Sequence, residues 1–123
     1  MLDDVAESCR ETALELLAGA LATVPEPSAL LPAVLPALHR RMGRSPVVEP
    51  TEEIRVAALR LVGRQVCTRC RDEAGAFGAE IVGIVSCGVE DAFPESKKEA
   101  CAAIGPLCDV LGMDGVQTHQ EVG

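Results

Sequence analysis

The sequence predicts an all-α fold, an α-solenoid of about five helices stacked as antiparallel helix pairs. The pattern at residues 9–17 returns 45 residues later at 54–62, and a weaker third copy starts another 43 residues on, at 97–104. Self-similarity at this period is typical of solenoids whose unit is a helix pair. The second position of each copy is basic and the fifth is small, at Arg10, Arg55 and Lys98 and at Ala13, Ala58 and Cys101 respectively.

The composition suits close helix packing and argues against several classes of protein. Hydrophobic residues make up 48% of the 123 residues, but the chain has two Phe and no Trp or Tyr, so Ala and Leu must fill the core. The net charge of −8 and the lack of aromatic stacking side chains argue against nucleic-acid binding. No signal peptide and no membrane-spanning run can be recognised, so we expect a cytoplasmic protein with no membrane contact.

The first helix is expected at residues 4–24, where Pro25 ends it. Its apolar residues recur at helical spacing, and glutamates line the opposite side. Leu16 belongs to this apolar face, so Leu16→Ala is expected to cost roughly 2–5 kcal/mol. The expected apolar face comprises Val5, Cys9, Thr12, Ala13, Leu16, Leu17 and Ala20.

Four further helices are expected, followed by a polar tail. Thr51 is the N-cap candidate of the third helix. The fourth helix contains three glycines, and its residues 81–85 also fit a short strand. A helix is preferred there because a strand has no place in this repeat. The expected ranges are 28–42, 51–70, 75–87 and 94–111 for the helices and 112–123 for a flexible tail.

The first, third and fifth expected helices resemble the inner helices of HEAT repeats, in which a loop acid precedes an Arg or Lys by six residues. Two copies keep this spacing, and the third has its acid seven residues before the lysine. The resemblance implies a ladder of ion pairs tying each loop to its neighbour, because an Arg that points into the stack needs a carboxylate. The alternative is a set of exposed helix charges. The ladder residues are Asp4, Arg10, Glu49, Arg55, Asp91 and Lys98.

Two longer strings, at residues 46–55 and 90–101, resemble axonemal dynein assembly factors of the HEAT-repeat class. The resemblance implies a cytoplasmic, non-enzymatic scaffold or adaptor that helps to preassemble the dynein arms of motile cilia. The partners that it implies are proteins, either dynein chains or chaperones, and it brings no catalytic residue and no cofactor. The alternative is a protein-binding module of another HEAT-repeat protein, in transport or microtubule regulation.

A less favoured alternative is a small thiol or zinc protein that uses Cys67 and Cys70. Their spacing gives half of a zinc site, which would need two further ligands, and no second paired spacing exists. A redox motif would need a thioredoxin-like strand before it. We therefore interpret Cys67 and Cys70 as packed cysteines at a helix end. Small core positions are expected for Cys9, Cys101 and Cys108.

Two charge stripes predict a binding surface. We expect the acidic stripe on the first helix and the basic stripe on the third to line a concave groove that docks a charged partner segment. Reversing Arg60 and Arg64 to Glu should then weaken partner capture while leaving folding intact. The alternative is a solvated face without a partner. The acidic residues are Glu7, Glu11 and Glu15, and the basic ones are Arg60, Arg64 and Arg71.

Overall fold

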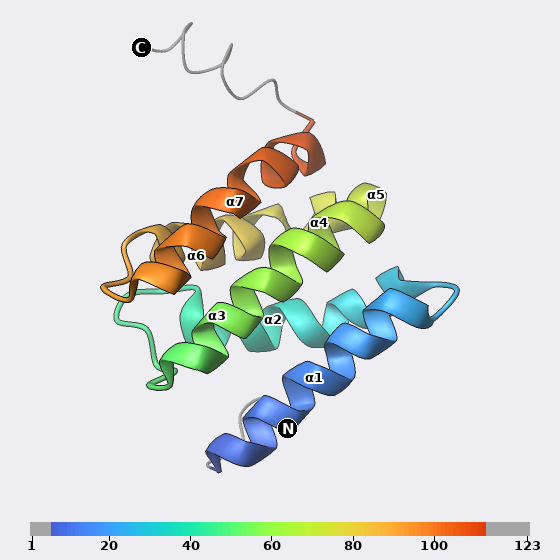
Figure 1. Ribbon diagram of the computed structural model, residues 1–123. Coiled ribbons are helices and arrows are strands. Elements are labelled where there is room, and N and C mark those ends of the chain that lie inside the picture. The colour runs from blue at the N-terminus through green and yellow to red at the C-terminus, as the bar shows by residue number, and fades with distance from the viewer. Residues whose placement is uncertain (1–5, 113–123) are drawn as a thin grey trace, which may run out of the picture.

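The computed structural model describes residues 6–112 and is helical throughout, with no strand in that range. Five helices of ten or more residues carry the architecture (Figure 1). Shorter helical elements connect them: a 3-10 turn at Pro27–Leu30, a π turn at Val62–Val66, α4 at Cys67–Arg69, α5 at Arg71–Ala74 and a second 3-10 turn at Gly75–Phe77. The five main helices are α1 (Glu7–Thr23), α2 (Leu31–Met42), α3 (Glu52–Leu61), α6 (Gly78–Val89) and α7 (Pro94–Val110).

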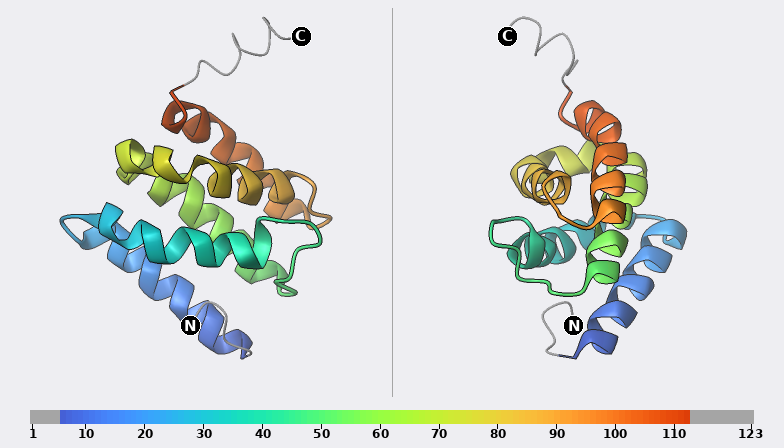
Figure 2. Two further views of the ribbon diagram at one scale, coloured as in Figure 1. Left: turned by 180° about the vertical axis from the view of Figure 1, so that it is seen from behind. Right: turned by 60° about the vertical axis from the view of Figure 1, so that its left-hand side comes forward.

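The helices form two layers. Helices α1, α3 and α7 lie side by side in one layer, with α3 packed between its two neighbours (Figure 1). Helices α2 and α6 form the second layer behind them (Figure 2). The predicted α-solenoid of antiparallel helix pairs is therefore confirmed.

The three inner helices begin in the same way. Their N-cap residues, Ala6, Thr51 and Phe93, share one extended backbone conformation, with φ between −88° and −81° and ψ between 118° and 124°. The amide four residues after each N-cap donates to the N-cap carbonyl, at 3.1–3.2 Å. Equivalent positions can therefore be counted from these N-caps.

This count corrects the third copy of the repeat by one residue. Four residues after Phe93 stands Lys97, not Lys98, and it is the counterpart of Arg10 and Arg55. The small position of that copy is Ala100, which is fully buried, whereas Cys101 is exposed. Because Lys97 and Lys98 are adjacent, the sequence fits either alignment of the third copy. The burial of Ala100 and the exposure of Cys101 decide for the alignment that starts from Lys97.

The predicted third helix at 51–70 is interrupted. After α3 the chain passes through the π turn, α4 and a break at Cys70, whose backbone angles are −111° and 30°. The π turn brings Gly63 against α7, where a Cβ on this glycine would lie 2.9 Å from the Cβ of Ala103. A π turn adds a residue to a helix and shifts the side chains that follow it.

The exposed face of α1 differs from the predicted one. Leu16 is 61% exposed, and Cys9 and Thr12 are also exposed, whereas Arg10 and Leu14 are buried. The apolar face is therefore turned by about one to two residues from the predicted one. The stability cost predicted for Leu16→Ala does not apply, because truncating an exposed side chain leaves no cavity.

The core uses aliphatic side chains from every main helix, as the composition predicts. No Phe is among the buried core residues; Phe77, in the 3-10 turn before α6, is partly buried and packs against the core. Small residues let the helices approach closely. The largest fully buried aliphatic side chains are Leu21, Leu31, Leu35, Leu59, Val62, Val66, Ile81 and Ile84.

The glycines of α6 belong to a helix and not to the alternative strand at 81–85. A Cβ on Gly83 would lie 2.6 Å from the carbonyl oxygen of Gly43, and one on Gly88 would lie 2.8 Å from both Ala100 Cβ and Leu59 Cδ2. Glycine weakens a helix by itself, so close contact between α6 and its neighbours explains its use here.

Gly88→Ala should destabilise the protein, although alanine favours helix by about 1 kcal/mol over glycine. The added methyl meets Ala100 and Leu59 at distances that force the helices apart. Gly19→Ala, inside α1 with no atom within 4 Å of the new Cβ, is the matched control and should stabilise by roughly 0.5–1 kcal/mol. Urea unfolding measures both, and equal shifts for the two variants would contradict the close packing.

Candidate protein-binding groove

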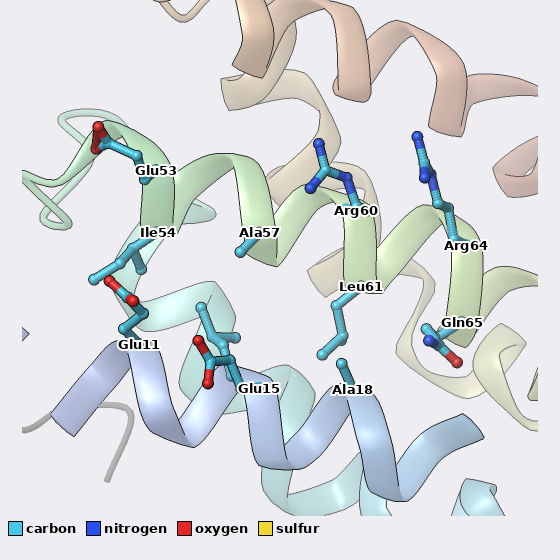
Figure 3. A pocket seen from close by; sticks show the side chains of 11 residues that line it. Glu11, Glu15, Ala18, Glu53, Ile54, Ala57, Arg60, Leu61, Arg64 and Gln65 are labelled. Carbon is cyan, nitrogen blue, oxygen red and sulfur yellow. The ribbon is translucent and has the colours of Figure 1, made fainter. Parts of the chain in front are cut away.

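A groove of about 580 Å³ runs between α1 and the α3–π segment (Figure 3). We call it the α1–α3 groove. Apolar side chains form its floor, because small alanines in both helices leave space between them. The floor residues are Leu14, Ala18, Ile54, Ala57 and Leu61, and the polar lining residues are Glu11, Glu15, Glu53, Arg60, Arg64 and Gln65.

The carboxylates of the groove come from both of its helices. Glu11 and Glu15 lie four residues apart on α1, and Glu53 lies in the first turn of α3 (Figure 3). All three are exposed. Three negative charges beside an apolar floor make this part of the groove complementary to a basic, amphipathic segment.

The arginines of the groove are less available to a partner than the predicted basic stripe requires. Arg60 and Arg64 point away from α1 (Figure 3) and donate to Oε2 of Glu99 on α7, with their Nη2 atoms at 3.2 and 3.1 Å. Glu99 is buried and neutralises one of the two charges, while both arginine side chains remain exposed to solvent. Reversing both arginines would place like charge beside a buried carboxylate, so we now expect that variant to lose stability as well as partner binding.

Two residues of the predicted stripes lie away from the groove. Glu7 accepts a hydrogen bond from Thr51 Oγ1 at 2.9 Å, which joins the starts of α1 and α3. This contact also takes the Thr51 hydroxyl away from the side-chain capping role expected of it. Arg71 is exposed on α5, beyond the break at Cys70, and does not line the groove.

A second groove of about 340 Å³ lies on the other side of the π turn, against α7. Arg64 lines both grooves, so the π turn places one side chain between two adjoining grooves. The second groove is lined by Gly63, Arg64, Thr68, Glu99, Ala102, Ala103 and Pro106.

The α1–α3 groove is held at its first end by a buried ion pair. Arg10 Nε and Nη2 donate to the two carboxylate oxygens of Glu49, at 2.7 and 2.9 Å, and both residues are at most 5% exposed. Arg41 Nη2 and the Thr51 amide donate to the same carboxylate, at 3.3 and 3.1 Å. Glu49 therefore connects α1, α2 and the start of α3.

Hydrogen bonds keep the pKa of Glu49 low although the side chain is buried. Burial alone would raise the pKa of this carboxyl, but hydrogen bonds from Arg10, the Thr51 amide and Arg41 outweigh burial and hold the pKa below its usual 4.5. Glu49 is consequently charged at neutral pH in the folded protein.

The same arrangement recurs in the next unit. Arg55 Nε and Nη2 donate to Asp91 at 2.7 and 3.2 Å, and the Phe93 amide donates to Asp91 at 2.8 Å. Burial raises the pKa of Asp91, but Arg55 and the Phe93 amide more than offset this rise and bring the pKa below 3.8. Each arginine thus pairs with the loop acid of the following unit, 36 or 39 residues later.

The ends of the predicted ladder differ from these two pairs. Lys98 is exposed and has no ion pair with another described residue; the equivalent position belongs to Lys97, as shown above. Asp4 lies outside the described residues. Glu49, six residues before Arg55, gives it a backbone contact instead of a carboxylate contact: Arg55 Nη1 donates to the backbone oxygen of Glu49 at 3.0 Å.

The comparisons with known proteins agree with this architecture. Residues 1–120 match the family model of dynein axonemal assembly factor 5-like proteins, described as TPR repeats. The chain belongs to this dynein axonemal assembly factor 5-like family. Its equivalent N-caps recur after 45 and 42 residues, a period in the HEAT and armadillo range and longer than the 34 residues usual for TPR units.

Curated relatives of the family are named dynein axonemal assembly factor 5. The chain is 34% identical to the Xenopus laevis protein over 100 residues, which are 81% of this chain and 12% of that protein. It is 33% identical to the Homo sapiens protein over 114 residues and 28% identical to the Drosophila melanogaster protein over 109, covering 86% and 85% of this chain and 13% of each relative. The chain thus spans about an eighth of these relatives. No solved structure matches it.

In this assembly factor 5-like chain, Arg69 is a residue that sequence reasoning missed. It reaches from α4 to the C-terminus of α1, where Nη1 donates to the carbonyls of Leu21, at 2.9 Å, and Ala22. The last turn of α1 contains no basic residue of its own. A cation from another helix satisfies its terminal carbonyls and complements its dipole. In the sequence, the need for this contact is indicated only by the lack of a basic residue in the last turn of α1.

Cys67 and Cys70 are packed side chains, each at most 1% exposed. Burial raises the pKa of Cys67 to about 11, and the neighbouring Cys70 adds to this rise. Burial also raises the pKa of Cys70. In residues 6–112, no group of three His, Cys, Asp or Glu side chains is placed to hold a metal ion, and no helix has the length and apolarity to cross a membrane.

The remaining cysteines differ from the core positions expected for them. Cys9 and Cys101 are exposed, and Cys108 is half-buried. Cys9 occupies the outward side of α1, while Cys101 follows from the one-residue shift of the third copy.

Glu49→Gln should lower the free energy of unfolding by roughly 3–5 kcal/mol at neutral pH, because neutralising one partner of a buried, hydrogen-bonded ion pair is strongly destabilising. The depressed pKa means that Glu49 stabilises the fold fully above 4.5 and that this stabilisation is lost as the pH falls through the folded value. The wild type and the variant should therefore converge below pH 4.5 in urea unfolding. Glu52→Gln, at an exposed site, is the control; a difference that persists in acid would contradict the assignment.

A thiol reagent added to the native protein should label Cys9 and Cys101 first and Cys67 last. Reaction requires an accessible thiolate, and Cys67 is both buried and held protonated by a pKa of about 11. Mass spectrometry of timed samples gives the order. Early labelling of Cys67 or Cys70 would instead support the alternative of a thiol protein that uses these two cysteines.

Proposed function

We propose that this chain is a protein-binding segment of a non-enzymatic scaffold that acts in the cytoplasmic preassembly of axonemal dynein arms. Its family and the printed names of its relatives support a role in dynein assembly. The observation that carries a binding role is the α1–α3 groove, an open apolar floor with three carboxylates on its rim. The proposed partner is a segment of a dynein chain or of a chaperone.

The groove favours a basic amphipathic helix or strand as its occupant. Leu14, Ile54 and Leu61 offer apolar surface to the uncharged side of such a segment. Glu11, Glu15 and Glu53 would receive its Lys or Arg side chains. Because these carboxylates are exposed, their main contribution is to steer the partner and set its register, with a dependence on salt.

The salt bridges of Glu99 restrict the choice of partner further. Arg60 and Arg64 already share this carboxylate, so an acidic segment would find only one uncompensated positive charge on this face. A basic segment meets three carboxylates whose counter-charges it can supply itself. The charge of the groove therefore selects basic over acidic segments.

Glu11→Lys combined with Glu15→Lys should weaken binding of a basic amphipathic helical peptide by about tenfold or more, equivalent to ~1.4 kcal/mol. Fluorescence anisotropy at low and high salt measures the loss. Asp72→Lys with Glu73→Lys makes the same charge change on α5, away from the groove, and should leave binding unchanged. Equal affinity of wild type and groove variant, or preference for an acidic peptide, would rule out the proposed surface.

The role in dynein assembly is tested with the same two double variants in a ciliated organism. Deleting the gene that encodes the chain should remove dynein arms from the axoneme, as seen by electron microscopy. Re-expression with the α5 variant should restore the arms, whereas the groove variant should not. Intact arms in the deletion strain would exclude the dynein role and leave peptide binding to be judged by the anisotropy measurement.

A further inference from the structure

The stack has two faces that no described element covers. The first, which we call the front face of α1, contains Cys9, Thr12 and Leu16. The second, the rear face of α7, contains Lys97, Cys101, Ile104 and Leu111. Of the five large exposed hydrophobic side chains in residues 6–112, Leu16, Ile104 and Leu111 lie on these two faces. Apolar side chains exposed on a helix face mark a surface that can bind a protein.

Equivalent positions show what the front face of α1 is shaped to contact. Ten residues after the N-cap stand Leu16 in α1, Leu61 in α3 and Ala103 in α7. Leu61 and Ala103 are at most 3% exposed because α3 packs against α1 and α7 packs against α3. Leu16 is 61% exposed because no described helix precedes α1. The front face is therefore the surface with which an inner helix packs on its predecessor.

The rear face of α7 is the complementary surface. Eight residues after the N-cap stand Leu14, Leu59 and Cys101; the two leucines are at most 3% exposed, and the cysteine is exposed. Eleven residues after the N-cap, Val62 is fully buried, whereas its counterpart Ile104 is 44% exposed. These are the positions with which an inner helix packs on its successor.

We propose that the rear face of α7 binds the front face of α1 from a second copy of this chain, head to tail. The contact would repeat the α1–α3 and α3–α7 interfaces that already exist within the molecule. Charge adds to the fit, because Lys97 occupies the position from which Arg10 and Arg55 reach the loop acid of the next unit. By sequence, Asp4 precedes its N-cap by two residues, as Glu49 and Asp91 precede theirs.

A head-to-tail contact joins two different surfaces and does not close on itself. The mass measured by sedimentation or light scattering, under reducing conditions, should therefore rise above the 12.9 kDa of one chain as concentration increases. Leu16→Glu blocks only the front face and Ile104→Glu only the rear face. Each variant should be monomeric, with unchanged helical circular dichroism because both positions are exposed.

Mixing the two blocked variants gives the decisive measurement. One intact rear face and one intact front face remain, so the mixture should form a single 1:1 complex of twice 12.9 kDa. Val82→Glu, at an exposed position of α6, should self-associate like the wild type. A protein that is monomeric at every concentration, a mixture that stays monomeric, or a Val82→Glu variant that dissociates would each overturn the proposal. Lys97→Glu should weaken self-association without unfolding and provides a second variant.

Discussion

The structure depends on a carboxylate placed two residues before the N-cap of an inner helix. Glu49 accepts the amide of its own loop through the Thr51 N–H and the guanidinium of Arg10 from the preceding helix. One side chain therefore sets both the entry of α3 and its distance from α1. Asp91 repeats both contacts for α7 with Arg55 and the Phe93 amide. Buried pairs of this kind contribute little net stability over an apolar pair, but breaking one is costly, so they fix the arrangement of the units.

The α1–α3 groove follows from how these two helices are held. The Arg10–Glu49 pair joins them near their N-termini, and Arg69 ties the segment after α3 to the terminal carbonyls of α1. Between these two attachments Ala18 and Ala57 are too small to fill the space between the helix axes. The groove is therefore framed by fixed contacts at both ends, and its shape does not require a partner to be present.

Electrostatics distinguishes the two sides of α3. Its α1 side carries carboxylates on an apolar floor, while its α7 side carries Arg60 and Arg64 folded onto Glu99. The basic stripe visible in the sequence does not lie on one helix, since Arg60 belongs to α3, Arg64 to the π turn and Arg71 to α5. Glu99, 35 and 39 residues away in the chain, accepts hydrogen bonds from Arg64 and Arg60, so these two arginines face α7. Likewise, Lys97 and Lys98 are interchangeable in sequence until the burial of Ala100 and the exposure of Cys101 separate them.

The sequence by itself determined the class of fold, the period of the repeat and the residues of the two ion pairs, because each is written in local spacing and residue type. Only the tertiary structure decided which acid each arginine meets, which side of α1 is covered, and where the third inner helix breaks. Leu16 illustrates the reason: it occupies a position that is apolar in every unit, but whether such a position is buried depends on a neighbouring helix. Burial and ion pairing join residues tens of positions apart, so they are properties of the stack and not of any one segment.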